Sequence, residues 1–552
     1  MVAPIRSALV LFLLGAASAA SAQDPTPDPR VPSLTPREFE IRGDVRVALP
    51  QIERQPLSGF GPPPRNYVVP ADRAAVTAAY DPDLADLPAL VLAPPSQPDA
   101  DILVPERLRA EGTYGNSAAR TGRFNLALPV ASGQLLADAD YDGLGASDDA
   151  DEVGFDRLSG GASIRTGGAV QFELFGRGLF DRYGLPGIRE RQNLTSTPIR
   201  SLTQFEGGVG VEGLGATPFL LQARYSADRL EPENASLMSG IGEDQSAGQV
   251  DARGEITLFD RVRVDAGGGV IGLDGGLGQD VQYGAAGAAI RLGRPGGPEL
   301  TLGARGLAYT VASGAGDGDA TAIAPIVDLS IPAGPTIRLF ASNDPMLVTR
   351  GLADHFQVNP FATAQPVLAP DVLRVNARAG AEITNGPVRL RGFAHYVEAP
   401  TWLVFDRSGD GLFIEGYESV RVQGVTAEAA IVSRSGISFE AGVTLRESRI
   451  SDSGGVNVIP FYAPNTARAG VQVPFSRGRL ALTAYRVAER PADRADRTSA
   501  PAYGVLSADA RFDIASMISV VAQADRLAGT VEEWPGYRLP GTTVRAGLRV
   551  TL

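Results

Sequence analysis

The feature that most constrains this chain is an alternation of apolar and polar side chains along segments of strand length. The last segment, residues 543–552, is nearly strict, and its apolar set is Val544, Ala546, Leu548, Val550 and Leu552. Side chains of a strand point to opposite faces with a period of two. The pattern therefore predicts a closing strand with one apolar face and one polar face.

The same alternation recurs from residue 106 to the C-terminus, for example in 170–177, 260–266 and 388–396. No helical pattern separates these segments. In a membrane barrel the apolar set faces lipid and the polar set faces a wet lumen, whereas a soluble sandwich seldom alternates through so many long segments. Residues 106–552 are therefore predicted to be all-β and to form a transmembrane antiparallel β-barrel.

Short and long connections between the segments alternate along the chain. Tight reversals at 131–133 and 385–386 contain the glycine and asparagine that such turns favour, and longer polar connections include 184–198 and 449–464. Outer-membrane barrels have short periplasmic turns and longer outer loops. Counting both kinds predicts about 22 strands, within a range of roughly 20 to 24, and an even number places both barrel ends on the periplasmic side.

The first 22 residues have the pattern of a secretory signal peptide. Arg6 supplies a positive charge, residues 8–17 are mostly apolar, and Ala20, Ser21 and Ala22 form a small-residue cleavage site. Beyond them there is no run of about 18 apolar residues, so a membrane-spanning part must use strands and not helices. These features predict export and residence in the outer membrane.

Residues 23–105 are rich in proline and aspartate, and we interpret them as an irregular periplasmic segment. One stretch inside this segment alternates, and its apolar positions are Phe39, Ile41, Val45 and Val47. The alternation predicts a short strand. Two hypotheses fit it: the strand packs on the barrel mouth, or it adds to a sheet edge of a periplasmic partner protein.

The overall charge excludes one class of partner. The chain has 50 basic and 63 acidic residues and a net charge of −13, which repels the phosphate backbone of nucleic acids. It has no cysteine and two histidines, so disulfides, cysteine-based zinc sites and histidine-rich metal sites are not expected. We expect no cofactor, and we expect outer-membrane lipid and lipopolysaccharide as partners.

No motif indicates an enzyme. His395 is predicted to face the lumen, and neither a serine nor an aspartate lies near it in sequence. A structural hydrogen bond is therefore favoured over a catalytic base. The glycine run at 267–269 has no helical pattern after it, so it does not predict a nucleotide-binding loop.

Charged side chains on the polar faces form the candidate site. The positions predicted to line the lumen are Glu173, Arg177, Arg261, Arg263, Asp265, Arg389, Arg391, His395, Arg545 and Arg549. We favour a ladder of cross-strand ion pairs that stiffens the barrel. The alternative is a charged lining that selects anionic solutes.

The connection 406–416 carries a weak calcium candidate. Oxygen donors alternate at Asp406, Ser408 and Asp410 before Gly411, which loosely resembles the start of a calcium loop, but Tyr417 stands where a glutamate is needed. An ordinary strand connection is favoured. An ion bound here would lie at the surface and be shared with lipopolysaccharide.

Three stretches resemble the barrels of TonB-dependent receptors. Residues 503–552 look like their closing strands, with Leu539, Pro540 and Gly541 leading into the last one, and 415–425 and 459–471 resemble other parts of the same barrels. The resemblance implies about 22 strands and uptake of a solute with a periplasmic partner. Those receptors carry a folded plug before the barrel and an aromatic C-terminus, whereas residues 23–105 show no plug-like pattern and the chain ends in Leu552.

A barrel of about 22 strands encloses a lumen that must be filled. The filling is expected from residues 23–105 or from a protein docked on them, and the connection 344–369 is expected to be an ordinary outer loop, with an inward fold as the alternative. Two functions follow as hypotheses. The barrel transports or takes up a solute with a periplasmic partner, or it is a structural scaffold whose 23–105 arm tethers an envelope complex.

Overall fold

The computed structural model describes most of the chain from residue 108 onward. The described ranges are 108–130, 133–145, 153–192, 196–215, 217–233, 244–274, 278–294, 297–313, 318–364, 366–408, 411–451, 457–528 and 531–552. The following predictions lie outside them: the signal peptide 1–22, the segment 23–105 with its candidate strand at Phe39, Ile41, Val45 and Val47, and the calcium candidate Asp410.

Within the described residues, 22 antiparallel strands form a closed wall. In chain order they are β1 (Leu108–Gly115), β2 (Arg120–Val130), β3 (Gly133–Leu144), β4 (Phe155–Thr166), β5 (Val170–Gly184), β6 (Ile199–Gly213), β7 (Phe219–Pro232), β8 (Gln245–Leu258), β9 (Val262–Asp274), β10 (Gln279–Gly293), β11 (Glu299–Ser313), β12 (Gly318–Pro332), β13 (Ile337–Asn343), β16 (Val375–Asn385), β17 (Val388–Arg407), β18 (Phe413–Val432), β19 (Ser438–Ile450), β20 (Asn465–Phe475), β21 (Gly478–Val487), β24 (Tyr503–Ala515), β25 (Ile518–Asp525) and β28 (Thr543–Thr551).

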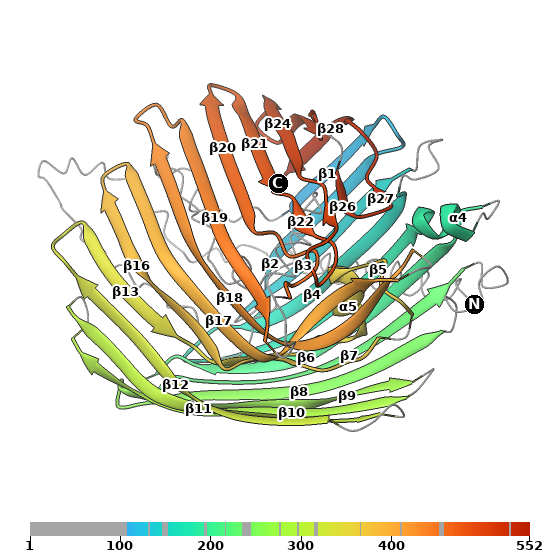
Figure 1. The fold of residues 1–552 in the computed structure, drawn as a ribbon. Helices are drawn as coiled ribbons and strands as arrows, with labels where there is room; N and C mark the ends of the chain where they lie inside the picture. Colours follow the sequence, from blue (N-terminus) through green and yellow to red (C-terminus); the bar gives the residue numbers. More distant parts are fainter. Residues whose placement is uncertain are drawn as a thin grey trace, which may run out of the picture. The chain divides into compact units, whose positions relative to one another are not determined.

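The ring closes because β1 pairs with β2 on one side and with β28 on the other. Figure 1 shows the strands curving around a lumen. The predicted all-β transmembrane antiparallel barrel and the count of about 22 strands are confirmed. Short turns gather at one end of the strands and long loops at the other, as the alternation of connections predicted.

The turn between β8 and β9 shows how the short reversals are made. Phe259 and Asp260 have φ values of 53° and 56°. Two successive residues in the left-handed region give the hairpin turn whose twist matches that of the flanking strands. Neither residue is glycine, so the short connection imposes this conformation at some cost in strain.

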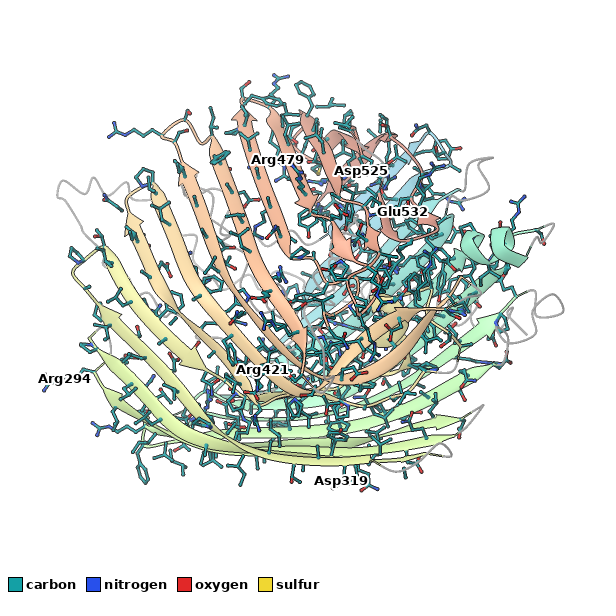
Figure 2. All side chains as sticks on the ribbon, in the orientation of Figure 1. Arg294, Asp319, Arg421, Arg479, Asp525 and Glu532 are labelled. Atoms are coloured by element: carbon teal, nitrogen blue, oxygen red, sulfur yellow. The ribbon has the colours of Figure 1, made fainter. Side chains whose placement is uncertain are left out.

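The outer face of the wall carries the apolar side chains. On β5, Phe172 and Leu174 are 55% and 59% exposed on the outer face. On β28, Leu548 is exposed in the same way, while Arg549 is buried on the opposite face. Figure 2 shows side chains projecting from both faces of the strands. A continuous apolar exterior of this kind is stable against lipid and not against water.

Eight short elements interrupt the long loops. They are α4 (Pro186–Gln192), β14 (Met346–Val348), α5 (Leu352–Val358), β15 (Asp371–Leu373), β22 (Arg490–Pro491), β23 (Ser499–Ala500), β26 (Glu532–Trp534) and β27 (Tyr537–Arg538). In the part of the chain that the structure describes, neither helix is long and apolar enough to cross a membrane.

The main hydrophobic core lies among the loops and not along the wall. The ring of Trp534 makes edge or tilted contacts with Phe405, Phe413 and Phe461, at centroid distances of 5.4, 4.8 and 5.1 Å. Tyr537 stacks on Phe361 at 3.7 Å. We call this packed region the loop cap, defined as the described residues of 185–188, 344–373, 401–413, 459–463, 490–500 and 531–539.

The connection between β13 and β16, which we call the lumen segment (344–374), folds inward. Its helix α5 contacts β6 and β7, which lie several strands away along the wall, and α5 lies inside the ring of strands in Figure 1. The expectation that 344–369 is an ordinary outer loop is therefore wrong. The physical reason is that Leu352, Phe356 and Phe361 are buried here, whereas an outer loop would leave them in water.

Candidate functional site

The longest hairpin of the barrel leaves the wall partway along its length. β17 and β18 have 20 residues each, and their register shifts between Ala399 and Trp402. Beyond the shift, Trp402, Leu403 and Val404 are all buried, so both faces of the strand are covered. A bulge bends a strand. The distal half of the hairpin consequently folds into the loop cap.

Polar contacts join the lumen segment to this bent hairpin. His355 Nδ1 lies 2.9 Å from Glu415 Oε2, and the hydroxyl of Tyr417 lies 3.2 Å from His355 Nε2. Asp371 accepts a hydrogen bond of 2.8 Å from the backbone N–H of Leu403 and pairs with Arg350. Burial lowers the pKa of Arg350, but Asp371, Tyr417 and Asp354 together outweigh burial and the pKa is raised. These groups hold α5 under the hairpin.

The other side of the lumen segment is tied to the opposite wall. Arg200 on β6 is 1% exposed and donates to the carbonyl oxygens of Pro360 and Ala362, at 3.2 and 2.8 Å. The carboxylate of Asp228 on β7 accepts a 3.0 Å bond from the N–H of Ala353. These bonds cross the lumen, so the segment bridges the loop end of the barrel.

A third attachment is made by β10. The side-chain amide of Gln279 donates to the carbonyl of Leu368 at 2.9 Å and accepts from its N–H at 2.8 Å. Such reciprocal bonds satisfy the backbone of a segment that has left the wall. The lumen segment thus has partners on β6, β7, β10 and β18, and together with the other parts of the loop cap it closes the mouth.

The start of the lumen segment is held by a buried arginine that sequence reasoning missed. Arg305 on β11 is fully buried and bonds both oxygens of Asp265, Asp344 Oδ1 and the carbonyl of Pro345. On its strand Arg305 shares the inner face with Leu307 and Tyr309, so no clean polar face marks it. Its neighbour Asp265, by contrast, was among the predicted lumen residues.

The predicted positions on β5 and β9 and in the turn before β9 differ in environment. Glu173 and Arg177 are partly buried on the lumen face of β5. Arg263 lies 3.9 Å from Asp265 on the same strand. Arg261 lies in the exposed turn before β9 and not in a strand. The structure therefore brings Arg263 and Asp265 together and leaves Arg261 at the turn end.

The predicted positions on β17 lie on one face. Arg389 pairs with Glu382 at 2.7 Å, and the Arg391 guanidinium lies 5.4 Å from the ring centre of Phe340. His395 is buried further along the strand, with its ring 6.3 Å from that of Phe393. His395 is separate from the His355 contacts in the loop cap.

The two arginines of the last strand hold the seam. Arg549 pairs with Glu111 of β1 at 2.5 Å, and Arg545 pairs with Asp142 of β3 at 3.1 Å and with Asp525 of β25 at 2.5 Å. All of these carboxylates are well shielded from solvent. This geometry is that of a cross-strand ion-pair ladder.

Two residues of the calcium candidate, Asp406 and Ser408, contact protein groups. Asp406 accepts a hydrogen bond of 2.8 Å from Arg494, which also pairs with Glu418. Ser408 donates its N–H to Leu412, as in a tight connection. Over the described ranges, no group of three or more metal-binding side chains is found. The arginine occupies the place next to Asp406 that a cation would take.

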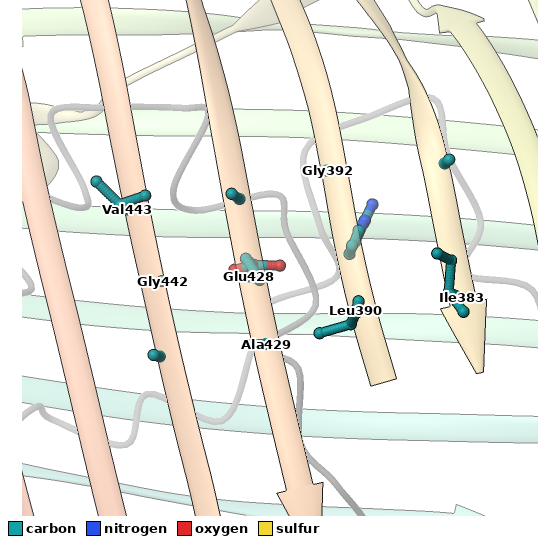
Figure 3. Close-up of a pocket in the computed structure, with 11 residues that line it drawn as sticks. Ile383, Leu390, Gly392, Glu428, Ala429, Gly442 and Val443 are labelled. Carbon is teal, nitrogen blue, oxygen red and sulfur yellow. The ribbon is translucent and has the colours of Figure 1, made fainter. Parts of the chain in front are cut away.

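A hollow of about 500 Å³ lies on the lipid-facing side of the wall and not in the lumen. It crosses β16 to β19, and its outward lining includes Ala381, Ile383, Leu390, Ala429 and Val443 (Figure 3). Ile383 and Leu390 are exposed on the outer face. Small residues at the other positions make the wall concave here, and the hollow plays no part in the closed mouth.

Comparison with solved structures finds barrels of the same fold. The copper transporter OprC has a TM-score of 0.63 at 12% identity, over 81% of this chain and 80% of that one. The FrpB iron transporter of Neisseria meningitidis (F3-3 variant) has a TM-score of 0.63 at 11% identity, over 81% of each chain. The ferric-catecholate import receptor Fiu of E. coli K12 has a TM-score of 0.58 at 12% identity, also over 81% of each.

At these identities the likeness concerns the fold. No family model matches the chain, and no curated protein matches it. The expectation of a TonB-dependent-receptor-like barrel is confirmed at the level of architecture.

Proposed function

We propose that this chain, built on a barrel of the same fold as the copper and iron transporters above, imports a solute across the outer membrane and closes its lumen with its own loops. The observation that carries the proposal is the lumen segment (344–374), which crosses the mouth and bonds to Arg200, Asp228 and Gln279. A wall of 22 strands without a filling would leak, so part of the filling or of the wall must move for transport to occur.

The lumen beneath the loop cap suits a polar or charged solute group. Its lining carries paired charges such as Arg263 with Asp265 and Arg389 with Glu382. Paired charges keep the net field small and still offer donors and acceptors along the path. We therefore favour a passage that hydrates a polar group over one that selects strongly for anions.

Export and a periplasmic partner complete the proposal. Residues 1–22 direct export, and residues 23–105 recruit a periplasmic protein. The similar structures include transporters of copper and of iron and a ferric-catecholate import receptor.

The test is single-channel conductance of purified barrels in planar bilayers. Replacing residues 346–372 by a short Gly-Ser linker is expected to convert a closed wild-type barrel into an open pore. Deleting 23–105 while keeping the signal peptide is the matched arm, and it is expected to leave the barrel closed. Arg200→Ala, which removes one tie across the lumen, is expected to give brief openings in a fully folded barrel.

The outcomes separate the hypotheses. A pore that opens only on deletion of 23–105 would make the N-terminal segment the plug and overturn closure by the loops. Barrels that stay closed in all three variants would contradict a transport function and favour the scaffold hypothesis. Capture of an envelope protein by the 23–105 arm would then be the expected property.

A further inference from the structure

The wall is interrupted on its loop side between β12 and β17. β13 ends at Asn343, and only 327–332 of β12 pair with it. Among the described residues, 318–326 of β12 pair with β11 on one side, and no strand pairs with them on the other. On the far side of the interruption lies the part of β17 beyond Ala399. Among the described residues, its single bridge toward the interruption joins Thr401 to Val372 of the lumen segment.

The interruption follows from the bend of the β17–β18 hairpin. Because the distal half of that hairpin folds into the loop cap, it no longer continues the wall above β13 and β16. β12 is left with an edge. The Pro325 carbonyl points to this edge, since it accepts a hydrogen bond from the side-chain amide of Asn343 at 2.5 Å. Backbone groups at alternate positions, including Ile323 and Thr321, point the same way.

The edge reaches into the depth range of the outer leaflet. The outward side chains of β12 are apolar from Ile331 up to Ile323, which is 82% exposed. Eight residue steps of a tilted strand span roughly 20 Å along the membrane normal, within the apolar band of about 25 Å. Thr321 and Asp319, the latter labelled in Figure 2, are the polar residues above this band. An open strand edge is not stable in hydrocarbon unless other groups form hydrogen bonds with its backbone N–H and C=O groups.

An apolar cluster lies directly behind this edge. Ala285, Leu307, Leu347 and Val372 pack together, and Ala322 of β12 packs against them. On the lumen side, a hydrogen bond of 3.1 Å between the hydroxyls of Tyr309 on β11 and Thr401 on β17 spans the gap. An apolar strip, with Ile323 on the outer face and Ala322 and Leu347 on the inner face, therefore flanks the edge.

We propose that this interruption is a lateral gate through which an amphipathic solute with an acyl chain passes between the outer leaflet and the lumen. The inference rests on the proposed transport function and names its cargo class. The apolar tail follows the strip at Ile323, Ala322 and Leu347, and the polar head enters the charged lumen. The mouth offers such a molecule no path, because the loop cap closes it with an aromatic core whose members Phe361 and Phe413 are fully buried.

The gate predicts opposite effects for two substitutions. Ala322→Trp fills the strip and is expected to slow passage about tenfold, because overpacking a close apolar contact is costly. Tyr309→Phe keeps the ring, removes the hydrogen bond to Thr401 and is expected to speed passage several-fold. Ala481→Trp is the matched control, because Ala481 pairs with Asp509 on a distant strand and adds the same bulk to the lumen.

The assay uses proteoliposomes containing the full-length protein. A fluorescent long-chain fatty acid is loaded into the outer leaflet, and its transfer to albumin inside the vesicle is followed. Wild-type protein is expected to accelerate transfer over protein-free vesicles, with Ala481→Trp unchanged. No acceleration by wild type, or equal slowing by both tryptophan variants, would overturn the gate. Passage of a sulfonated hydrophilic dye through the 346–372 replacement variant would still support a transport function. Failure of the gate and failure of the proposed function are therefore distinguishable.

A second measurement does not depend on transport. A photo-reactive phenylalanine derivative at Ile323 is expected to form adducts with lipid in a folded barrel. An adduct with a second polypeptide would overturn the gate and identify the β12 edge as a strand-docking site. Phe172, exposed on the outer face of β5, is the control position and is expected to give lipid adducts in either case.

Discussion

The imidazole of His355 contacts the carboxylate of Glu415 at 2.9 Å inside the protein, and both side chains are almost fully buried. This contact joins the helix α5 of the lumen segment to the bent part of β18. It connects the lumen segment, which fills the lumen, to the β17–β18 hairpin, which covers it. Because the two come from different loops, their separation is the simplest motion that opens the mouth.

Glu415→Ala is expected to loosen the loop cap. The substitution leaves the buried His355 ring without its carboxylate, which costs about 1–3 kcal/mol. Thermal melting in detergent should show the loss, together with more frequent openings in conductance records. The matched control is Glu447→Ala on β19, whose side chain is about half exposed and whose pair with Arg449 is screened by solvent and is expected to contribute little. Equal losses from both variants would contradict a special role for Glu415.

Phe361→Ala is expected to open the loop cap without unfolding the barrel. Phe361 is fully buried and stacks on Tyr537 at 3.7 Å, and truncating a buried phenylalanine costs about 3–5 kcal/mol. The loss should appear as rapid proteolysis within 344–374 and 531–539, while the heat-modifiable mobility of the barrel on gels stays that of the wild type. Phe172→Ala on the lipid face is the control. Cooperative loss of the whole barrel in Phe361→Ala would show that the cap and the wall are one folding unit.

Breaking the ion pair at the seam is expected to weaken barrel closure. Arg549→Met leaves Glu111 buried beside a side chain that cannot pair with it, and removing one partner of such a pair costs about 3–5 kcal/mol. The double variant Glu111→Gln with Arg549→Met should recover part of that loss. Urea unfolding of Arg549→Met, Glu111→Gln and the double variant gives the coupling free energy. Additive losses would show that the two groups act independently.

The loop between β21 and β24 is expected to loosen in acid. The pKa of Asp493 is held below its ordinary value, chiefly by the hydroxyl of Thr498 and also by backbone N–H groups that include that of Arg497. Because the pKa of Asp493 is lowered in the folded state, its ionised carboxylate stabilises the loop at pH values above the unfolded pKa. This stabilisation is lost as the pH falls through the folded pKa. Limited proteolysis at 488–502 should therefore accelerate below the ordinary range of an aspartate.

Asp493→Asn removes the titrating group and serves as the control for this pH dependence. The variant is expected to lose the acid-induced change and to show fast cleavage of the loop at neutral pH as well. An unchanged acid profile in Asp493→Asn would assign the effect to another group.

The chain's local pattern determined the wall. Alternation over residues such as 543–552 encodes which side chains meet lipid, and the lengths of the connections encode how many strands there are. Both are local properties, because a strand's two faces and a turn's geometry depend on neighbouring residues. The barrel, its strand number and the turn and loop ends could therefore be predicted before any contact was known.

The tertiary structure alone decided what fills the lumen. Arg200 meets Pro360 and Ala362 across more than a hundred residues of sequence, and Arg305 meets Asp344 where β13 ends. Apart from the seven-residue helix α5, the apolar residues of 344–374 follow no regular period, so an outer loop was expected where an inner segment lies. Pro400 marks a bulge in β17, but the direction in which the hairpin then folds depends on the loops that it meets. A periodic pattern shows on which face of a strand a side chain lies. The burial of an aperiodic loop depends instead on partners that only the closed barrel brings close to it.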